Sequence, residues 1–264
     1  MKLRLSALAP AAVVLLGLLA GCSDSPVESG YGELKVYLVD GPANLQHVYI
    51  VVKQVDAHVA NADSSSGWVI INNVPATYDL LELANGVSAV LGGAKLAVGK
   101  YTQIRLLLDT GCTVVVSDTT YPLVVPSGLQ TGLKLNHNFT IASGQLYELT
   151  LDFNADKSIK PDTGDSYKLD PVIRIVANVI SGSISGTIAP AAAHATVWTT
   201  VGTDTVATHA DTTSGMFELM ALPAGTYDVS VTSGNAAYAD TSIAGVNVVA
   251  QQTTNLGTIT LRAQ

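Results

Sequence analysis

The sequence is poor in charged residues, in aromatic residues and in cysteine. Only 13% of its 264 residues are charged, 6% are aromatic, and two are cysteines, Cys22 and Cys112. So few cysteines exclude a scaffold held together by disulfides. Glutamate is scarce, at five residues, whereas threonine, serine, glycine and valine are abundant, a usage that favours strands and turns over helices. The composition therefore predicts an all-β protein.

Basic residues are also few. Lysine and arginine number 13 against 21 aspartates and glutamates, which gives a formal net charge of −8. An acidic chain without a lysine or arginine run repels phosphate backbones, so we expect no nucleic acid as a partner. Histidines do not have metal-ligand spacing, and the sequence contains no Gly-rich phosphate loop and no hydrolase elbow. We therefore predict no catalytic residue, no metal and no cofactor. The histidines are His47, His58, His137, His194 and His209.

The N-terminus has the features of a secretory signal. Lys2 and Arg4 precede an apolar stretch, residues 5–20, which is shorter than the roughly 20 residues that span a bilayer. The stretch ends in Leu19-Ala20-Gly21-Cys22, which resembles the lipobox of bacterial lipoproteins. This resemblance implies that residues 1–21 are removed and that the Cys22 thiol is acylated. An ordinary secretory signal with an incidental cysteine is the alternative.

Residues 22–30 are small and polar and include Pro26 and Gly30, so we expect a tether rather than a folded segment. More than one acyl chain on one cysteine gives durable membrane attachment, because each buried methylene contributes about 0.8 kcal/mol. Ser23 after the lipidated cysteine resembles lipoproteins that are sent to the outer membrane. The predicted location is the cell envelope, at the outer membrane if the host has two membranes.

From Tyr31 onward, apolar and polar residues alternate as they do in half-buried strands. Leu34, Val36 and Leu38 share one face of the first run, and residues 53–59 alternate in the same way. Helical spacing occurs over residues 78–91, where Asn85-Gly86 interrupts it, so we expect a turn or two of helix at most. Further strands are predicted at residues 68–71, 101–108, 112–116, 121–125, 133–141, 145–153 and 168–179.

The character of the chain changes near residue 181. Beyond it Arg262 is the only basic residue, and short strands recur about every ten residues, as in a small sandwich. Residues 178–183 lack a flexible linker composition, so one domain is expected to run directly into the next as a stiff pair. The predicted fold is two β-sandwich domains in tandem, residues 31–181 and 182–264, behind a cleaved lipoprotein signal peptide.

Residues 31–176 contain a series of short blocks: Asp40-Gly41-Pro42, Gly67-Trp68, Tyr78-Asp79-Leu80-Leu81, Asn85-Gly86, Gly99-Lys100-Tyr101, Val125-Pro126-Ser127-Gly128, Leu151-Asp152-Phe153, Lys157-Ser158-Ile159 and Leu169-Asp170-Pro171-Val172-Ile173. In these blocks the region resembles the bacterial domain-of-unknown-function family 4382. The activity of that family is unknown, so the resemblance implies a location and a fold rather than a chemistry.

Residues 182–262 contain a second set of blocks: Gly182-Ser183-Ile184-Ser185-Gly186-Thr187-Ile188, Ser214-Gly215-Met216-Phe217 and Leu222-Pro223-Ala224-Gly225-Thr226-Tyr227. This region resembles the carboxypeptidase regulatory-like, prealbumin-like sandwich, which implies a non-catalytic module. Residues 96–101 of the first domain, Leu96-Ala97-Val98-Gly99-Lys100-Tyr101, repeat the turn of the last block. The repeat suggests that both domains share one sandwich pattern.

Oxygen-bearing side chains alternate at Asp152, Asn154 and Asp156, as they do at the start of a calcium loop. Against calcium, Lys157 stands where such a loop needs glycine, and Thr163 stands where it needs a bidentate glutamate. The pattern favours a strand end whose Asn and Asp cap a turn, with a calcium site as the weaker alternative.

Trp198 is the candidate ligand-binding residue. Strict alternation over residues 194–201 turns Ala195, Val197 and Val201 toward the core and Trp198 outward, and an outward tryptophan among hydroxyls could stack on a sugar ring. The alternative is that it packs on a neighbouring strand or on the first domain. The residues expected beside it are His194, Thr196 and Thr200. Trp68 is predicted to pack in the core, and Cys112 to be a buried, inert thiol.

These features predict a non-catalytic cell-envelope lipoprotein that acts as a binding or structural module. Its expected partners are the membrane, through lipidated Cys22, and a glycan or an envelope protein. A carbohydrate-binding surface lipoprotein that uses exposed aromatic residues is one alternative. An envelope hydrolase with residues assembled across strands is the other, because sandwiches also host hydrolases.

Overall fold

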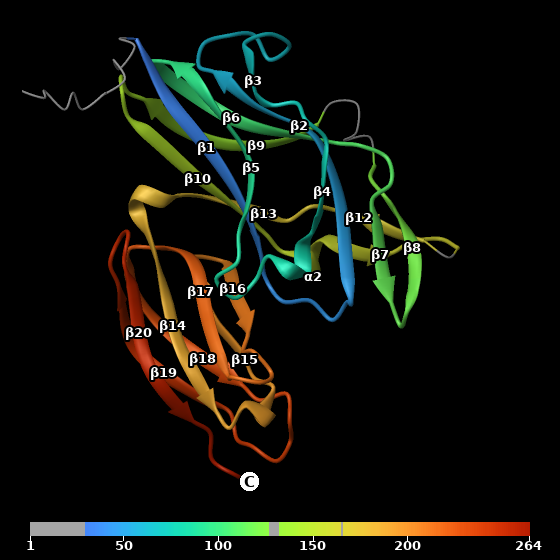
Figure 1. Ribbon diagram of the computed structural model, residues 1–264, viewed down its shortest axis with the longest axis vertical. Coiled ribbons are helices and arrows are strands. Elements are labelled where there is room, and N and C mark those ends of the chain that lie inside the picture. Colours follow the sequence, from blue (N-terminus) through green and yellow to red (C-terminus); the bar gives the residue numbers. More distant parts are fainter. Residues whose placement is uncertain (1–29, 127–131, 165) are drawn as a thin grey trace, which may run out of the picture.

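The computed structural model describes residues 30–126, 132–164 and 166–264. In these ranges the chain is built almost wholly of strands, which form two sandwiches arranged end to end (Figure 1). The all-β prediction is confirmed. The predicted leader, the acylation site Cys22 and the tether up to residue 29 lie outside the described residues. None of the helices in the described part of the chain has the length and apolarity to cross a membrane.

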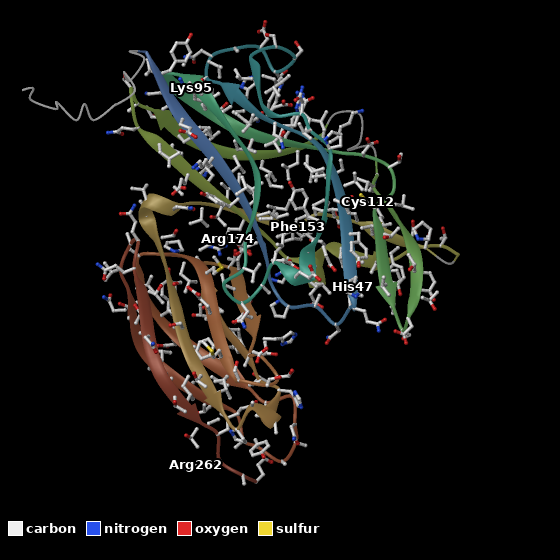
Figure 2. The ribbon with its side chains drawn as sticks, viewed as in Figure 1. His47, Lys95, Cys112, Phe153, Arg174 and Arg262 are labelled. Atoms are coloured by element: carbon white, nitrogen blue, oxygen red, sulfur yellow. The ribbon has the colours of Figure 1, made fainter. Side chains whose placement is uncertain are left out.

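The N-terminal domain has a four-stranded sheet in the order β13 (Ile173–Ala177), β10 (Leu146–Phe153), β1 (Tyr31–Asp40) and β5 (Ala89–Ala97). Strand β1 runs parallel to β10 and antiparallel to β5. Leu34, Val36 and Leu38 are fully buried, as the alternation in this run predicts. They face a core that contains the largest fully buried side chain, Phe153 (Figure 2).

The facing sheet of this domain has nine strands. Its path is β11 (Ile159–Pro161), β12 (Tyr167–Leu169), β8 (Thr119–Val124), β7 (Thr113–Val116), β2 (His47–Val59), β6 (Gly99–Leu108) and β9 (Leu133–Ile141). Strands β3 (Trp68–Asn72) and β4 (Ala76–Asp79) also pair with β2. The 13 residues of β2 thus organise most of this sheet, because β3, β4, β6 and β7 all pair with it.

Two segments differ from the sequence prediction. The predicted strand 168–179 is divided into β12 and β13, which belong to different sheets. Pro171 lies in the gap and has no N–H to continue a ladder. In the segment 78–91, the expected helical turn is the single 3₁₀ turn η1 (Leu80–Glu82), after which the chain turns at Asn85 and enters β5.

The C-terminal domain pairs a three-stranded sheet with a four-stranded sheet. The first has the order β17 (Met216–Pro223), β14 (Ser181–Ala189) and β20 (Thr253–Thr260). The second has the order β16 (Asp204–His209), β15 (Thr196–Val201), β18 (Gly225–Thr232) and β19 (Thr241–Val248). The short turn η3 (Ala191–Ala193) lies in the connection from β14 to β15. A separate core fills this domain, with Ile184, Val197 and Val229 fully buried.

The two domains follow one another with little between them. Only the 3₁₀ turn η2 (Asn178–Ile180) separates β13 from β14, which confirms the direct connection that the linker composition indicates. The described chain starts at the far end of the N-terminal domain, and the C-terminus lies at the opposite end of the long axis (Figure 1).

The repeated turn of the sequence has the same hydrogen bond in both domains. The Tyr101 hydroxyl donates to the Ala97 carbonyl at 3.0 Å, and the Tyr227 hydroxyl donates to the Pro223 carbonyl at 2.6 Å. In each case the acceptor lies four residues upstream, across a turn that brings the chain into β6 or β18. Each tyrosine thus fixes the corner before its own strand.

Candidate functional site

An open groove of about 430 Å³ lies where the two domains meet. Strands β15 and β16 form its C-terminal side, and the β1–β2 connection and the one-turn helix α2 (Ala155–Ser158) form its N-terminal side. The polar and aromatic side chains that line it are Asn44, Asp156, Thr196, Trp198, Thr205 and His209. The groove is therefore made by both domains together.

Trp198 lies on the outer face of β15. Its neighbours Val197 and Thr199 are buried beneath the sheet, whereas the indole is half-buried in the groove. The indole N–H donates to Thr232 Oγ1 on the paired strand β18 at 3.2 Å. This bond holds one edge of the ring and leaves the groove lined by an aromatic surface.

Of the three residues that the sequence places beside Trp198, one lines the groove and two do not. Thr196 lines the groove, and its hydroxyl is 3.0 Å from His209 Nδ1 on the paired strand β16. Thr200 and His194 do not line it; His194 takes a left-handed conformation after η3, before β15 begins. Sequence reasoning missed His209, because only the β15–β16 register brings it opposite Thr196.

The three residues of the possible calcium loop, Asp152, Asn154 and Asp156, do not contact a common point. Asp152 forms an ion pair with Arg174 at 2.5 Å, and Asn154 caps α2 by accepting the Lys157 amide at 2.9 Å. Asp156 points to the groove. Within the described ranges, no three His, Cys, Asp or Glu side chains cluster closely enough to hold a metal ion.

A much smaller cavity, of about 10 Å³, lies inside the domain junction. Asp40 reaches it from β1 and Thr208 from β16; Asp40 Oδ1 accepts the Ala155 amide at 2.9 Å. Asp40 Oδ2 and Thr208 Oγ1 are buried and have no hydrogen-bond partner. Burial raises the pKa of Asp40 to about 8, and the nearby Asp152 and Asp79 add to the rise. The volume suits one water molecule.

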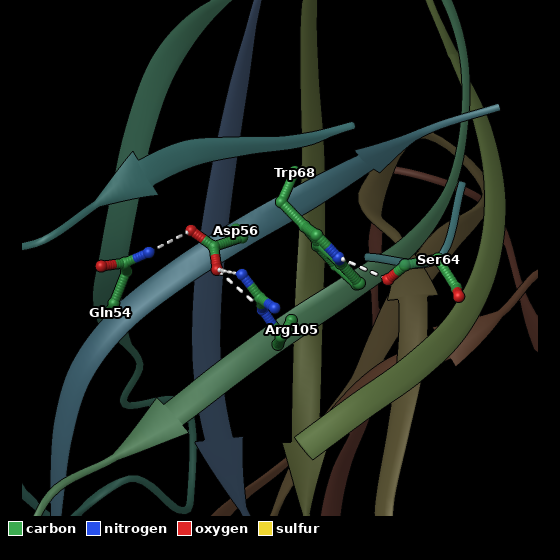
Figure 3. A network of polar contacts seen from close by, with 5 residues as sticks. All are labelled: Gln54, Asp56, Ser64, Trp68 and Arg105. Atoms are coloured by element: carbon green, nitrogen blue, oxygen red, sulfur yellow. Dashed lines mark hydrogen bonds and ion pairs between the residues drawn. The ribbon is translucent and has the colours of Figure 1, made fainter. Parts of the chain in front are cut away.

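On the outer side of β2, a polar cluster covers a fully buried carboxylate (Figure 3). Asp56 Oδ2 accepts two bonds from Arg105, at 2.8 and 2.6 Å, and Oδ1 accepts one from Gln54 at 2.7 Å. Trp68 lies 4.1 Å from the guanidinium and donates to the Ser64 carbonyl at 3.1 Å. The prediction that Trp68 packs in the core is therefore wrong: the indole covers the ion pair instead. The arrangement stabilises the sheet and leaves Asp56 no free oxygen.

Cys112 is buried in the N-terminal domain, as predicted (Figure 2). The Val51 amide donates to its sulfur at 3.3 Å. Burial raises the pKa of the thiol, which keeps it protonated and unreactive.

Fold and groove together define a two-sandwich β protein with a cleft at the domain junction. The family model described as Domain of unknown function (DUF4382) matches residues 31–171, more than half of the chain, and the chain belongs to this family. A search of curated proteins gives no match. The resemblance of residues 182–262 to the carboxypeptidase regulatory-like sandwich stays a prediction.

Solved structures give low structural similarity. A chain in a cohesin–X-dockerin complex from Acetivibrio cellulolyticus is 29% identical, with 31% of this chain and 58% of that chain covered and a TM-score of 0.25. The match thus spans little more than half of that chain. A shaft pilin from Lactobacillus rhamnosus GG is 11% identical over 90% and 98% of the two chains, with a TM-score of 0.24. The TIE protein of Bacillus anthracis is 13% identical over 88% and 34%, with a TM-score of 0.24. Similarity this low carries no argument about function.

Proposed function

We propose that the chain is a non-catalytic lipoprotein of the cell envelope, anchored through acylated Cys22, whose two domains act as one stiff binding or structural module. The observation that carries the proposal is the polar contact between the domains. Asn85 Oδ1 in the side chain accepts the backbone amide of Glu218 at 2.7 Å, and Asn85 Nδ2 donates to the backbone carbonyl of Met216 at 3.2 Å. One side chain thus satisfies two backbone groups of β17, an edge strand of its sheet.

A second contact supports the same stiffness. Arg174 lies on β13 (Figure 2). Its guanidinium pairs with Asp152 and also donates to the Ala221 carbonyl on β17 at 2.9 Å. Both charged side chains are 15% exposed, and charge-assisted bonds that are partly shielded from water are stronger than surface pairs. Asn85 and Arg174 therefore hold β17 from two places in the N-terminal domain.

The acidic residues support a module without catalysis rather than a hydrolase. Asp56 and Asp152 are paired with arginines, and Asp79 pairs with His47 and also accepts the Val48 amide. Asp40 has the raised pKa that a general acid needs, but the cavity that it faces has room for one water and none for a substrate. None of these carboxylates is arranged to act on a substrate.

The experiment is a distance measurement across the junction. The chain expressed from residue 23 lacks Cys22 and has only the buried Cys112, so Val90→Cys and Val249→Cys, at 57% and 43% exposed positions, place one spin label on each domain. A single narrow distance distribution is expected. A broad distribution would show that the domains reorient freely and would contradict the stiff module.

Carbohydrate binding in the groove is the second candidate. It is supported by the half-buried indole of Trp198 in an open groove that also offers Thr196, Thr205, Asn44 and Asp156, since sugar sites combine an aromatic platform with a few polar groups. A glycan array tests it with Trp198→Ala and, as a matched control, Ile70→Ala, which removes an exposed apolar side chain that does not line the groove. Binding lost only in Trp198→Ala supports a sugar site. Without such a signal, an envelope protein becomes the better candidate for the groove.

A further inference from the structure

Three large apolar side chains are exposed at the end of the N-terminal domain where the described chain begins. Tyr31 is 44% exposed, Val98 46% and Leu146 49%. They belong to β1, to the β5–β6 turn and to the start of β10. Exposed apolar residues that stand alone need no explanation, whereas a group of them at one end marks a candidate contact surface.

Backbone pairing brings the three residues together. The Val98 amide donates to the Gly30 carbonyl at 2.9 Å, and the Gly144 amide donates to the Tyr31 carbonyl at 2.8 Å. In the sheet, Glu33 is the partner of Leu146, and since Leu34 points into the core, the odd residues of β1 point outward on the same face. We call Tyr31, Val98 and Leu146 the apolar tip.

The chain that precedes the tip is short. Eight residue-to-residue steps lead from Cys22 to Gly30, and they span at most ~28 Å when fully extended. An acyl group on Cys22 therefore keeps this end of the molecule within ~28 Å of the lipid surface. A tether of that length makes contact between tip and bilayer an intramolecular event, so a weak contact suffices.

We propose that the apolar tip lies against the bilayer and sets the orientation of the anchored protein, with the C-terminal domain directed away from the lipid. This inference rests on the proposed anchoring through Cys22. The occupant is a lipid surface, because the acyl chains on Cys22 enter the bilayer and the short tether holds the tip close to that bilayer. Lys100 follows Val98 closely on the same hairpin, and a lysine stem can lie along an interface while its ammonium group reaches a lipid phosphate.

The test uses the full acylated chain on phosphatidylcholine vesicles that contain a lipid with a nitroxide on its acyl chain. Cys22 is acylated and Cys112 is buried, so a fluorophore reacts with a single introduced cysteine. Val98→Cys and Leu146→Cys report on the tip. Val249→Cys, at a 43% exposed position of the C-terminal domain, is the matched control with the same label.

Quenching at positions 98 and 146 is expected to exceed that at position 249 by at least about twofold, and Tyr31→Ser should reduce it. Equal quenching at all three positions, in vesicles that float with the protein, would overturn the orientation and leave the anchoring intact. Cross-linking between copies through position 98 in place of quenching would show that a second copy covers the tip, and would also overturn it. A chain that does not float with the vesicles would overturn the anchoring and this inference together.

Discussion

Asn85 of the N-terminal domain pairs with the backbone at Glu218 of the C-terminal domain as a neighbouring strand would. Its side chain accepts the Glu218 amide at 2.7 Å and donates to the Met216 carbonyl. Asn85 can reach β17 because its own backbone is left-handed, with φ of 55°, a conformation that asparagine tolerates better than most residues. A turn that interrupts the 78–91 segment thus also joins the two domains.

Asn85→Ala should broaden the interdomain distance distribution and lower the free energy of unfolding by about 1 kcal/mol, because two hydrogen bonds to β17 are lost. Asn61→Ala is the matched control. Asn61 has the same left-handed backbone, with φ of 64°, but lies in the turn after β2. If both variants leave the distribution equally narrow, the Asn85 contact does not hold the junction.

Asp40 makes stability depend on pH in a defined direction. Its pKa is about 8 in the folded chain and about 4 in an unfolded one, so between these values the folded state binds more protons. Stability should therefore fall as pH rises from 4 to 8, by on the order of 5 kcal/mol from this group. Asp40→Asn cannot ionise and keeps an oxygen for the Ala155 amide, so it should be more stable than wild type, increasingly so up to pH 8.

Chemical denaturation at several pH values measures this difference. Asp63→Asn, the same substitution on an exposed loop, is the control. If the free energies of unfolding of Asp40→Asn and wild type differ by the same amount from pH 4 to pH 9, Asp40 is ionised in the folded chain throughout this range.

Tyr101→Phe should lower the free energy of unfolding by about 1 kcal/mol, because the buried hydroxyl donates to the Ala97 carbonyl and that acceptor is left without its donor. Tyr227→Phe should cost less, since Tyr227 is only half-buried. Tyr121→Phe provides a control on a tyrosine that contacts Tyr167 through its ring. Equal losses in all three variants, measured by urea denaturation, would argue against a specific role for the two corners.

Trp198→Ala should leave the C-terminal domain folded, with a loss of no more than about 1 kcal/mol, because the indole lies on the outer face and makes one side-chain hydrogen bond. Phe217→Ala is the comparison. Phe217 is 2% exposed in the core, and its removal should cost about 3–5 kcal/mol. A thermal melt in which the two losses match would place Trp198 in the core instead.

Much of the fold follows from local pattern. The alternation of Leu34, Val36 and Leu38 predicts the buried face of β1, and Pro171 offers a signal for the break between β12 and β13. The buried carboxylate of Asp56 does not follow from pattern. Period-two alternation assigns a residue to a face, but it does not tell whether a distant side chain such as Arg105 covers that face.

The groove, too, can be predicted from the sequence only in part. Alternation places Trp198 on the outer face of β15, whereas Asn44, Asp156 and His209 join it only through strand register and domain packing. These relationships connect residues far apart in the sequence, and no local spacing encodes them. The Asn85-Gly86 turn is visible in the sequence, but its contact with β17 is not.

The central claim, that this two-domain body is held at a membrane through one thiol, is tested most directly by mass spectrometry of the mature protein from envelope fractions. The N-terminal peptide is predicted to start at Cys22 and to carry the mass of a diacylglycerol. A peptide that retains Met1, or one that carries Cys22 with an unmodified thiol, would contradict the account.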